Sequence, residues 1–483
     1  MRALCSALLL ALVPSSFTAA SAAQDAAEAS ASVSSWRSSR DEILAGSIAS
    51  LESLADWCNA NEVFVERDRV FELILLIDPE HFRAHKGLKH VQTRDGKWVP
   101  PEKRVASRNF NPIAAAKFQE RMRTTLAPTC DALFALVDRC SLVGAERDIV
   151  YEDIVRFDRD NARVRQERGE AMHDGVWVLQ ETLAGKTRRP ELKAAVRAAL
   201  ASVPEPEAFA LGDDEPTLAL RWKVAVRTPT VRVLSTGDAA EAAKLAKYAS
   251  ATRVVLHQLF ALPAKERPAS TVYAVGGAEE RARFVAIHPD ISPEQRAALA
   301  DFSGMGLNGR GDFAISSTNA EERLDSVVRQ TIGRTLIDEL RIEPSCGWAF
   351  EGFGMYLTRE LTGTRMTWFS LPNGASAEQI ALRKKLIGAK SNWMNDAHEL
   401  LESPRKPDLG ALLAKGIDAL SIEELLYAYV LAAYLIEARA AETPTLLSSL
   451  ADAKSIEDVF REVLGMDFAA TDARVRRWLS ERR

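Results

Sequence analysis

Apolar and polar positions alternate in two different ways along this chain. In residues 23–205 the apolar residues recur with the spacing of helices, and the longest such stretch covers residues 114–143. A Pro- and acid-rich stretch at 203–216 then marks a domain boundary. Beyond it, the period of β-strands appears at residues 220–234, 270–275 and 313–316. The pattern predicts a helical region followed by a region that contains a small sheet.

Helical periodicity returns between and after these strands. Helices are expected at 239–260, from residue 279, and at 379–401, 421–441, 455–464 and 471–479. This order of elements predicts an α-rich α+β fold. We therefore expect a leader at 1–22, a helical region at 23–205, a core at 216–375 and a helical C-terminal subdomain at 376–483.

The helical region contains an internal repeat. Residues 70–99 and 150–178 each begin with an apolar helix, turn at Asp78 or Asp158, and end on an Asp-Gly-x-Trp-Val segment. Asp-Gly favours a type I′ turn, in which both central residues have positive φ, so each unit is expected to close with a β-hairpin. The helix-turn-helix part is similar to tetratricopeptide-like units. Two copies are fewer than a solenoid needs, so we expect them to pack with the helix between them.

The first 22 residues have the layout of a secretion signal. Arg2 precedes an apolar stretch from Leu4 to Val13, which is too short to span a bilayer, and the A-x-A-type site Ala20-Ser21-Ala22 follows. The mature protein is therefore expected to be exported, to the periplasm or out of the cell. Elsewhere no stretch has the ~18 uninterrupted apolar residues of a membrane-spanning helix, so we expect no transmembrane segment after cleavage.

Composition narrows the class of protein. The 483 residues are 47% hydrophobic and 27% charged, which is typical of a globular chain. The net charge of −5 provides no basic excess for binding nucleic acid. No C-x-x-C pair supports a zinc ribbon or a redox motif. The four cysteines after the leader could hold one disulfide or remain buried thiols: Cys58, Cys130, Cys140 and Cys346.

Two segments of the core carry the most informative pattern. Residues 327–336 read VVRQTIGRTL, and residues 348–357 read WAFEGFGMYL. They resemble the active-site helices of gluzincin-type zinc metallopeptidases, in particular the bacterial peptidase MA-like family. That family has an apolar helix with HExxH, followed by a helix with E-G-x-x-x-Y. The resemblance covers the chain from residue 216 onward and implies a gluzincin-like core with a small sheet beside the site.

The residues that would bind and use zinc are replaced. HExxH works because positions i and i+4 share one helix face and place two imidazoles on one Zn²⁺, while the intervening Glu is the general base. Here the histidine positions hold Gln330 and Arg334, and the base position holds Thr331. Only the third ligand position, Glu351, keeps a metal-binding side chain. We expect no zinc, and a vestigial site in which Arg334 takes the place of the cation and pairs with Glu351.

Three further residues are weaker candidates for a role at this site. His257 and His288 precede the vestigial helix and could act with Glu351 in a reorganised active site, although surface or capping roles explain them more simply. Tyr427 could be a catalytic remnant, although a tyrosine at helical spacing is usually part of the core.

Other motifs carry less information. His81, His85 and His90 have a spacing that could bind a metal, but their segment has the pattern of a surface helix. Residues 304–309 match G-x-G-x-x-G and residues 310–312 spell Arg-Gly-Asp, yet we expect only a Gly-rich loop there.

Together these features favour an exported peptidase-like protein, without catalysis, that binds a protein or peptide through the vestigial cleft or the helical repeats. Two alternatives stay open. One is an active peptidase or hydrolase with a reorganised site. The other is a structural envelope protein whose working surface is the repeats.

Overall fold

The computed structural model describes residues 36–101, 106–211, 220–263, 268–299, 304–307, 311–364, 376–388, 390–451 and 455–482. The predicted leader at 1–22 lies outside these ranges. The chain forms two compact units, Met1–Glu167 and Arg168–Arg483. The prediction of an α-rich α+β fold is confirmed, because helices dominate and the strands form three small sheets. Within the described ranges, no helix is long and apolar enough to cross a bilayer.

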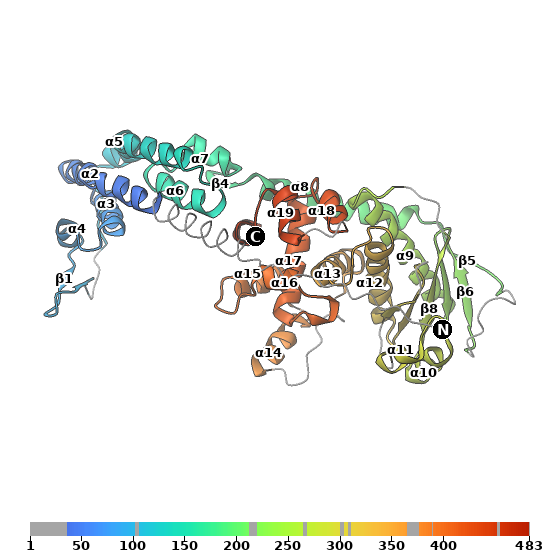
Figure 1. Ribbon diagram of the computed structural model, residues 1–483. Helices are drawn as coiled ribbons and strands as arrows, with labels where there is room; N and C mark the ends of the chain where they lie inside the picture. Colours follow the sequence, from blue (N-terminus) through green and yellow to red (C-terminus); the bar gives the residue numbers. More distant parts are fainter. Residues whose placement is uncertain are drawn as a thin grey trace, which may run out of the picture. The chain divides into compact units, whose positions relative to one another are not determined.

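The first unit is helical apart from one hairpin (Figure 1). Residues 36–46 are helical, and they precede α2 (Ile48–Ala60), α3 (Phe64–Ile77), α4 (Phe82–Gly87), α5 (Pro112–Arg139), α6 (Gly144–Phe157) and α7 (Ala162–Glu167). Strands β1 (Val91–Gln92) and β2 (Trp98–Val99) pair antiparallel after α4. The core of the unit is one apolar cluster that includes Leu54, Phe71, Phe118, Leu133 and Tyr151.

The internal repeat is confirmed. At the aspartate turn, the N–H of Asp78 donates to Ile74 and the N–H of Asp158 donates to Ile154. A short helix follows in both copies, and then a hairpin, which in the second copy is β3 (Glu170–His173) with β4 (Val176–Leu179).

The repeat also reaches further back than the sequence indicated. Helices α2 and α5 end in the same way, because Val63 donates to the carbonyl of Cys58 and Leu142 donates to that of Val137. The residue before each donor has positive φ, 59° at Glu62 and 48° at Ser141. This is the left-handed turn that commonly closes a helix. Each copy is therefore two successive helices, a short helix and a hairpin.

The two hairpins turn differently. In the second, Asp174 and Gly175 both have positive φ (52° and 78°), as a type I′ turn requires, so that prediction is confirmed. In the first, only Gly96 has positive φ (85°), so the type I′ prediction is wrong there. The extra residue in this hairpin lengthens its loop, and a longer loop needs a single left-handed residue, which Gly96 supplies.

The second unit contains a six-stranded sheet with the order β5-β6-β7-β8-β10-β9. Its strands are β5 (Glu207–Ala208), β6 (Val224–Arg227), β7 (Val231–Ser235), β8 (Ser270–Val275), β9 (Gly304–Gly306) and β10 (Phe313–Ser316). Strands β7, β8 and β10 run parallel, while β9 is antiparallel to β10 and lies at the edge. The prediction that residues 304–309 form only a loop is therefore wrong for 304–306.

Alternate residues of the strands cover the two faces of this sheet. Val272 and Ile315 face α9 (Ala239–Leu259) and α12 (Ala320–Asp338) in the large core, whereas Tyr273 belongs to a separate apolar cluster. That cluster also contains residues of α10 (Ala278–Ile287), which is followed by α11 (Pro293–Ala298). Helices α12 and α10 thus lie on opposite faces of the sheet.

The rest of the second unit is helical. It contains α8 (Gln180–Ser202), α13 (Gly347–Thr362), α14 (Ala377–Leu386), α15 (Trp393–Leu401), α16 (Leu409–Leu413), the 3₁₀ turn Ile417–Ala419, α17 (Ile422–Ala438), α18 (Thr443–Ser449), α19 (Ile456–Leu464) and α20 (Phe468–Glu481). The expected helix at 379–401 is two helices, α14 and α15. Helix α8 packs on α9 and α17, so the division between units falls before it and not at 203–216.

Helix α20 fastens the second hairpin to the core of this unit. Arg474 donates to the carbonyl of Arg168 at 2.8 Å, and Arg477 donates to the buried carboxylate of Glu170 at 2.5 Å. Glu481 accepts the N–H of Leu179 at 2.8 Å. Three residues on one face of α20 thus hold both strands of the hairpin.

Candidate functional site

The two helices that resemble a peptidase site pack against each other in the second unit. Helix α12 begins at Asn319, whose side chain accepts the N–H groups of Glu321 and Glu322, and its apolar face is buried in the large core. Helix α13 is buried along almost its whole length. The predicted order of a helix, a loop and a second helix is confirmed.

Gly352 explains one fixed feature of the E-G-x-x-x-Y pattern. A Cβ atom at this position would lie 2.4 Å from the carbonyl oxygen of Ala428 on α17. The helix backbones approach too closely for any side chain there. About one turn of α13 later, Tyr356 also contacts α17, where its hydroxyl donates to Glu437 at 2.7 Å. The pattern therefore fixes the packing of α13 on α17.

The carboxylate of Glu351 is held by a different arginine from the one we expected. Glu351 is 6% exposed, and Nη2 of Arg329 lies 2.5 Å from both carboxylate oxygens. The expected pair of Glu351 with Arg334 is wrong. Positions 329 and 334 are five residues apart, which places them about 140° apart around the helix, so they cannot both face Glu351.

Gln330 and Arg334 instead face the edge strand β9. Arg334 binds its neighbour one turn later, with Nη2 2.9 Å from both carboxylate oxygens of Asp338. A Cβ atom on Gly306 would lie 2.7 Å from Nη1 of Arg334, and one on Gly304 would lie 2.7 Å from Nε2 of Gln330. The two side chains therefore rest on the two glycines of β9.

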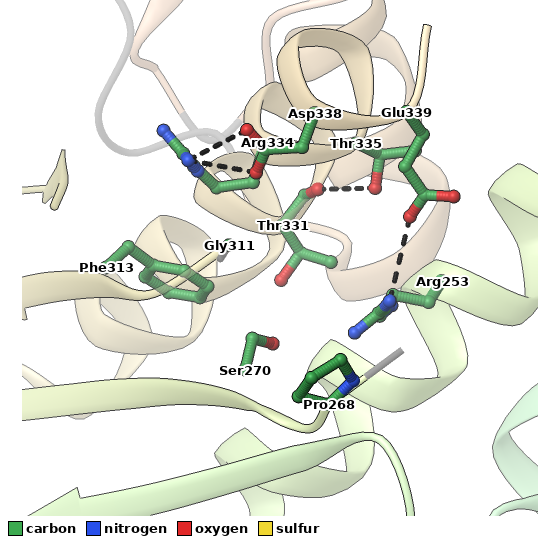
Figure 2. Close-up of a pocket in the computed structure, with 10 residues that line it drawn as sticks. All are labelled: Arg253, Pro268, Ser270, Gly311, Phe313, Thr331, Arg334, Thr335, Asp338 and Glu339. Atoms are coloured by element: carbon green, nitrogen blue, oxygen red, sulfur yellow. Dashed lines mark hydrogen bonds and ion pairs between the residues drawn. The ribbon is translucent and has the colours of Figure 1, made fainter. Parts of the chain in front are cut away.

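Thr331 has no role that resembles a catalytic base. Its hydroxyl donates to the carbonyl of Val327 at 2.8 Å, and its own carbonyl accepts the hydroxyl of Thr335 at 2.9 Å. Beside it is a cavity of about 30 Å³, room for about one water molecule, which is drawn in Figure 2. It is lined by Arg253, Pro268, Ser270, Gly311, Phe313, Thr331, Arg334, Thr335, Asp338 and Glu339.

The side chains at this site do not fit a zinc ion. A guanidinium is a permanent cation without a lone pair to donate, and Arg334 and Arg329 both stand at the site. Both oxygens of Glu351, the one remaining ligand type, are already bound. Among the residues that the structure describes, no group of three or more His, Cys, Asp or Glu side chains could hold a metal.

His288 lies on the opposite face of the sheet from α12. It is 2% exposed and its ring packs on Tyr273 and Phe284. Its Nδ1 accepts the N–H of Asp290 at 3.2 Å, and burial lowers the pKa of the imidazole. The hypothesis that His288 acts with Glu351 is not supported, because the sheet separates them.

His257 and Tyr427 also have structural partners. Nε2 of His257, on α9, lies 3.2 Å from Glu339 at the end of α12. Tyr427 is fully buried, and its hydroxyl donates to Asp472 of α20 at 2.6 Å. Burial, followed by the charge of Asp472, raises the pKa of this phenol well above its ordinary value. Both residues fasten helices together, and neither approaches Glu351 through these contacts.

The three histidines of the first unit make local contacts. Nε2 of His85 lies 2.7 Å from the carbonyl of Pro79, and Nδ1 lies 2.9 Å from Nδ1 of His90. His81 caps α4 by accepting the N–H of Ala84. The ring of His85 also stacks on Trp98 of the hairpin. These contacts join the short helix of the repeat to its hairpin.

Cys58, Cys130, Cys140 and Cys346 are free thiols, so no disulfide joins them. Cys140 is exposed, while the other three are buried. Burial raises the pKa of Cys58 and of Cys130 to about 12.

Arg310 of the Arg-Gly-Asp segment, and residues 308–309 of the glycine pattern, lie outside the described residues.

Sequence reasoning missed Arg329 and the glycines of β9. The i,i+4 spacing of Gln330 and Arg334 did indicate that they share a face, but not that the face points to β9.

Comparison with known proteins found no matching family model, no similar curated protein and no similar solved structure.

Proposed function

We propose that this chain is an exported, non-catalytic, peptidase-like protein that binds a protein or peptide in an extended conformation along β9. The observation that carries the proposal is the open edge of this strand beside Gln330 and Arg334. Strand β9 ends the order of the sheet, so its outer edge has no partner strand in the described part of the chain.

The hydrogen-bond register between β9 and β10 leaves backbone groups of β9 directed away from the sheet, where an added strand would pair. Leu307 donates to Asp312 across the ladder, so the alternate residues Gly304 and Gly306 direct their N–H and C=O groups outward. Unpaired groups of this kind are a template for an added strand. Because both residues are glycine, no side chain at these two positions restricts a second backbone. The amide of Gln330 and the guanidinium of Arg334 lie over them as further donors.

The polar groups beside this edge support binding without hydrolysis. The hydroxyl of Thr331 is used within its own helix, and Arg329 saturates Glu351. A guanidinium cannot activate water as a general base, because it stays protonated. The resemblance to gluzincin peptidases thus extends to the helix frame and the E-G-x-x-x-Y segment, and not to the catalytic groups.

Fluorescein-labelled casein peptides provide a test on the full-length mature chain. We expect fluorescence polarisation to detect binding, and Arg334→Ala to weaken it about tenfold, since a hydrogen bond to a charged group contributes about 1.5–3 kcal/mol. Arg283→Ala is the matched control, because Arg283 is an exposed arginine of α10, on the opposite face of the sheet. It should bind as the wild type does.

The same assay separates the alternatives. Cleavage of the labelled peptides would contradict the non-catalytic proposal and favour a reorganised active site. Binding that is unaffected by Arg334→Ala and Gln330→Ala would place the interaction on the helical repeats. If no peptide binds, the peptide-binding proposal fails and the structural envelope role is favoured.

A further inference from the structure

A second cavity lies in the second unit, and no residue of α12, α13 or β9 lines it. Its volume is about 550 Å³, within the range of pockets that bind small molecules. Three helices supply its walls: α8, α15 and α20. The lining residues are Arg189, Asn392, Met394, Asn395, Glu399, Leu479 and Arg482.

Two arginines of this cavity share a single buried carboxylate. Glu437 is 2% exposed, and Arg482 binds both of its oxygens, with Nε at 2.7 Å and Nη2 at 2.6 Å. The hydroxyl of Tyr356 supplies a third hydrogen bond. Burial opposes the charge of Arg482, but the hydrogen bonds and charge of Glu437 outweigh it and raise its pKa. Arg482 and Tyr356 therefore satisfy Glu437 without help.

Arg189 is the surplus cation of this wall. Its Nε is 3.4 Å from Glu437 and 3.3 Å from the carbonyl of Gly185, and no described residue bonds its two Nη groups. Two guanidinium groups thus lie against the one buried carboxylate of Glu437, which Arg482 already binds through both oxygens. A recessed cation of this kind is stabilised by an anion.

The remaining polar residues of the lining are Asn392, Asn395 and Glu399. Asn392 uses its side-chain oxygen to cap α15, by accepting the N–H groups of Met394 and Asn395, which leaves its NH₂ group. Glu399 is the one carboxylate of the lining. It is 68% exposed and binds Lys385 at 2.8 Å, which also binds Asp396, so water and Lys385 screen its charge.

We propose that this cavity binds a small organic acid. Arg189 and Arg482 hold the carboxylate, and the apolar body of the ligand lies against Met394 and Leu479. Guanidinium groups bind carboxylates through paired, charge-assisted hydrogen bonds. The proposal does not depend on the peptide-binding function, because the two sites share no residue.

Calorimetric titration of the full-length mature chain tests it with three probes: 4-methylpentanoate, its uncharged amide and inorganic phosphate. We expect the acid to bind at least tenfold more tightly than the amide. Arg189→Gln should weaken the acid at least tenfold while the protein stays folded, since Glu437 keeps Arg482 and Tyr356. Arg188→Gln is the matched control, because the neighbouring Arg188 binds Glu191 and does not line the cavity. It should bind the acid as the wild type does.

A second variant, Asn395→Asp, leaves both arginines in place and adds a negative charge to the lining. It should also weaken the acid. The proposal is overturned if the acid and its amide bind equally, if Arg189→Gln binds the acid as the wild type does, or if 4-methylpentanoate does not bind. Binding of phosphate alone would overturn the assignment of an apolar acid.

Discussion

Removal of the Arg329 side chain should destabilise the second unit, because it strands the carboxylate of Glu351. In this pair the carboxylate side chain is 8% exposed and the arginine side chain is 30% exposed. Loss of one partner from a buried ion pair costs about 3–5 kcal/mol. Since water reaches the arginine, we expect a smaller loss for Arg329→Ala, about 2–3 kcal/mol.

This loss corresponds to a measurable change in melting temperature. The second unit has about 300 residues. At about 2.1 cal/mol/K for each residue, its unfolding entropy is about 0.6 kcal/mol/K. Arg329→Ala should therefore lower the melting temperature of this unit by about 3–5 °C. Scanning calorimetry of the full chain measures the change, and Arg341→Ala, at an exposed position, is the control.

A double-mutant cycle tests the pairing itself. Glu351→Gln removes the stranded charge, so it should cost less in the Arg329→Ala background than in the wild type, with a coupling of about 1–2 kcal/mol. The same change should be additive with Arg334→Ala within about 0.5 kcal/mol. Additivity of Arg329→Ala with Glu351→Gln, or an unchanged melting temperature in Arg329→Ala, would refute the pairing.

Three other predictions follow from the packing. Gly352→Ala should destabilise the unit by about 3 kcal/mol or more in urea unfolding, since its Cβ would meet the backbone of α17, whereas Gly333→Ala, with 4.0 Å to its nearest neighbour, should be neutral or stabilising. Equal effects would contradict this account. The lowered pKa of His288 implies stability that is present above about pH 6.5 and lost as the pH falls through the folded value, so His288→Phe should lose less stability than the wild type between pH 7 and 5. An equal loss would show that another group titrates. Cys140 should react rapidly with a thiol reagent in the native protein, while Cys58, Cys130 and Cys346 should react only in denaturant, as monitored by mass spectrometry. Rapid labelling of a buried thiol would mean that its surroundings open.

Local chemistry made the repeat visible in the sequence, but only in part. The aspartate turns and Asp-Gly-x-Trp-Val segments use specific residue types, and these mark the second half of each copy. The ends of α2 and α5 adopt the same turn with different residues, Glu62 in one and Ser141 in the other. The two turns share a backbone conformation but not a residue type. The sequence therefore could not show that the first helix belongs to each copy of the repeat.

At the candidate site, the sequence predicted which residues share a helix face but not what that face contacts. The spacing of Gln330 and Arg334 placed them together, and β9 lies beneath them. Which arginine of α12 faces Glu351 depends on how α12 is rotated about its axis relative to α13. That rotation is set by packing around the whole core, so the sequence could not identify the partner. Likewise, the position of His288 depends on which face of the sheet α10 covers, and its own segment carries no signal for this.

The clamp that α20 places on the second hairpin affects how the protein can be made. Glu170 and its partner Arg477 are separated by 307 residues of chain. Contacts over such distances form slowly, because a long loop must close before they stabilise anything. Helix α20 is among the last of the described residues to be synthesised, so its contacts with the second hairpin form only near the end of their synthesis. The contacts within the first unit lie entirely in residues synthesised much earlier. During synthesis the second unit is exposed as an incomplete, apolar intermediate, and a chaperone that binds unfolded chains would meet it for most of that time.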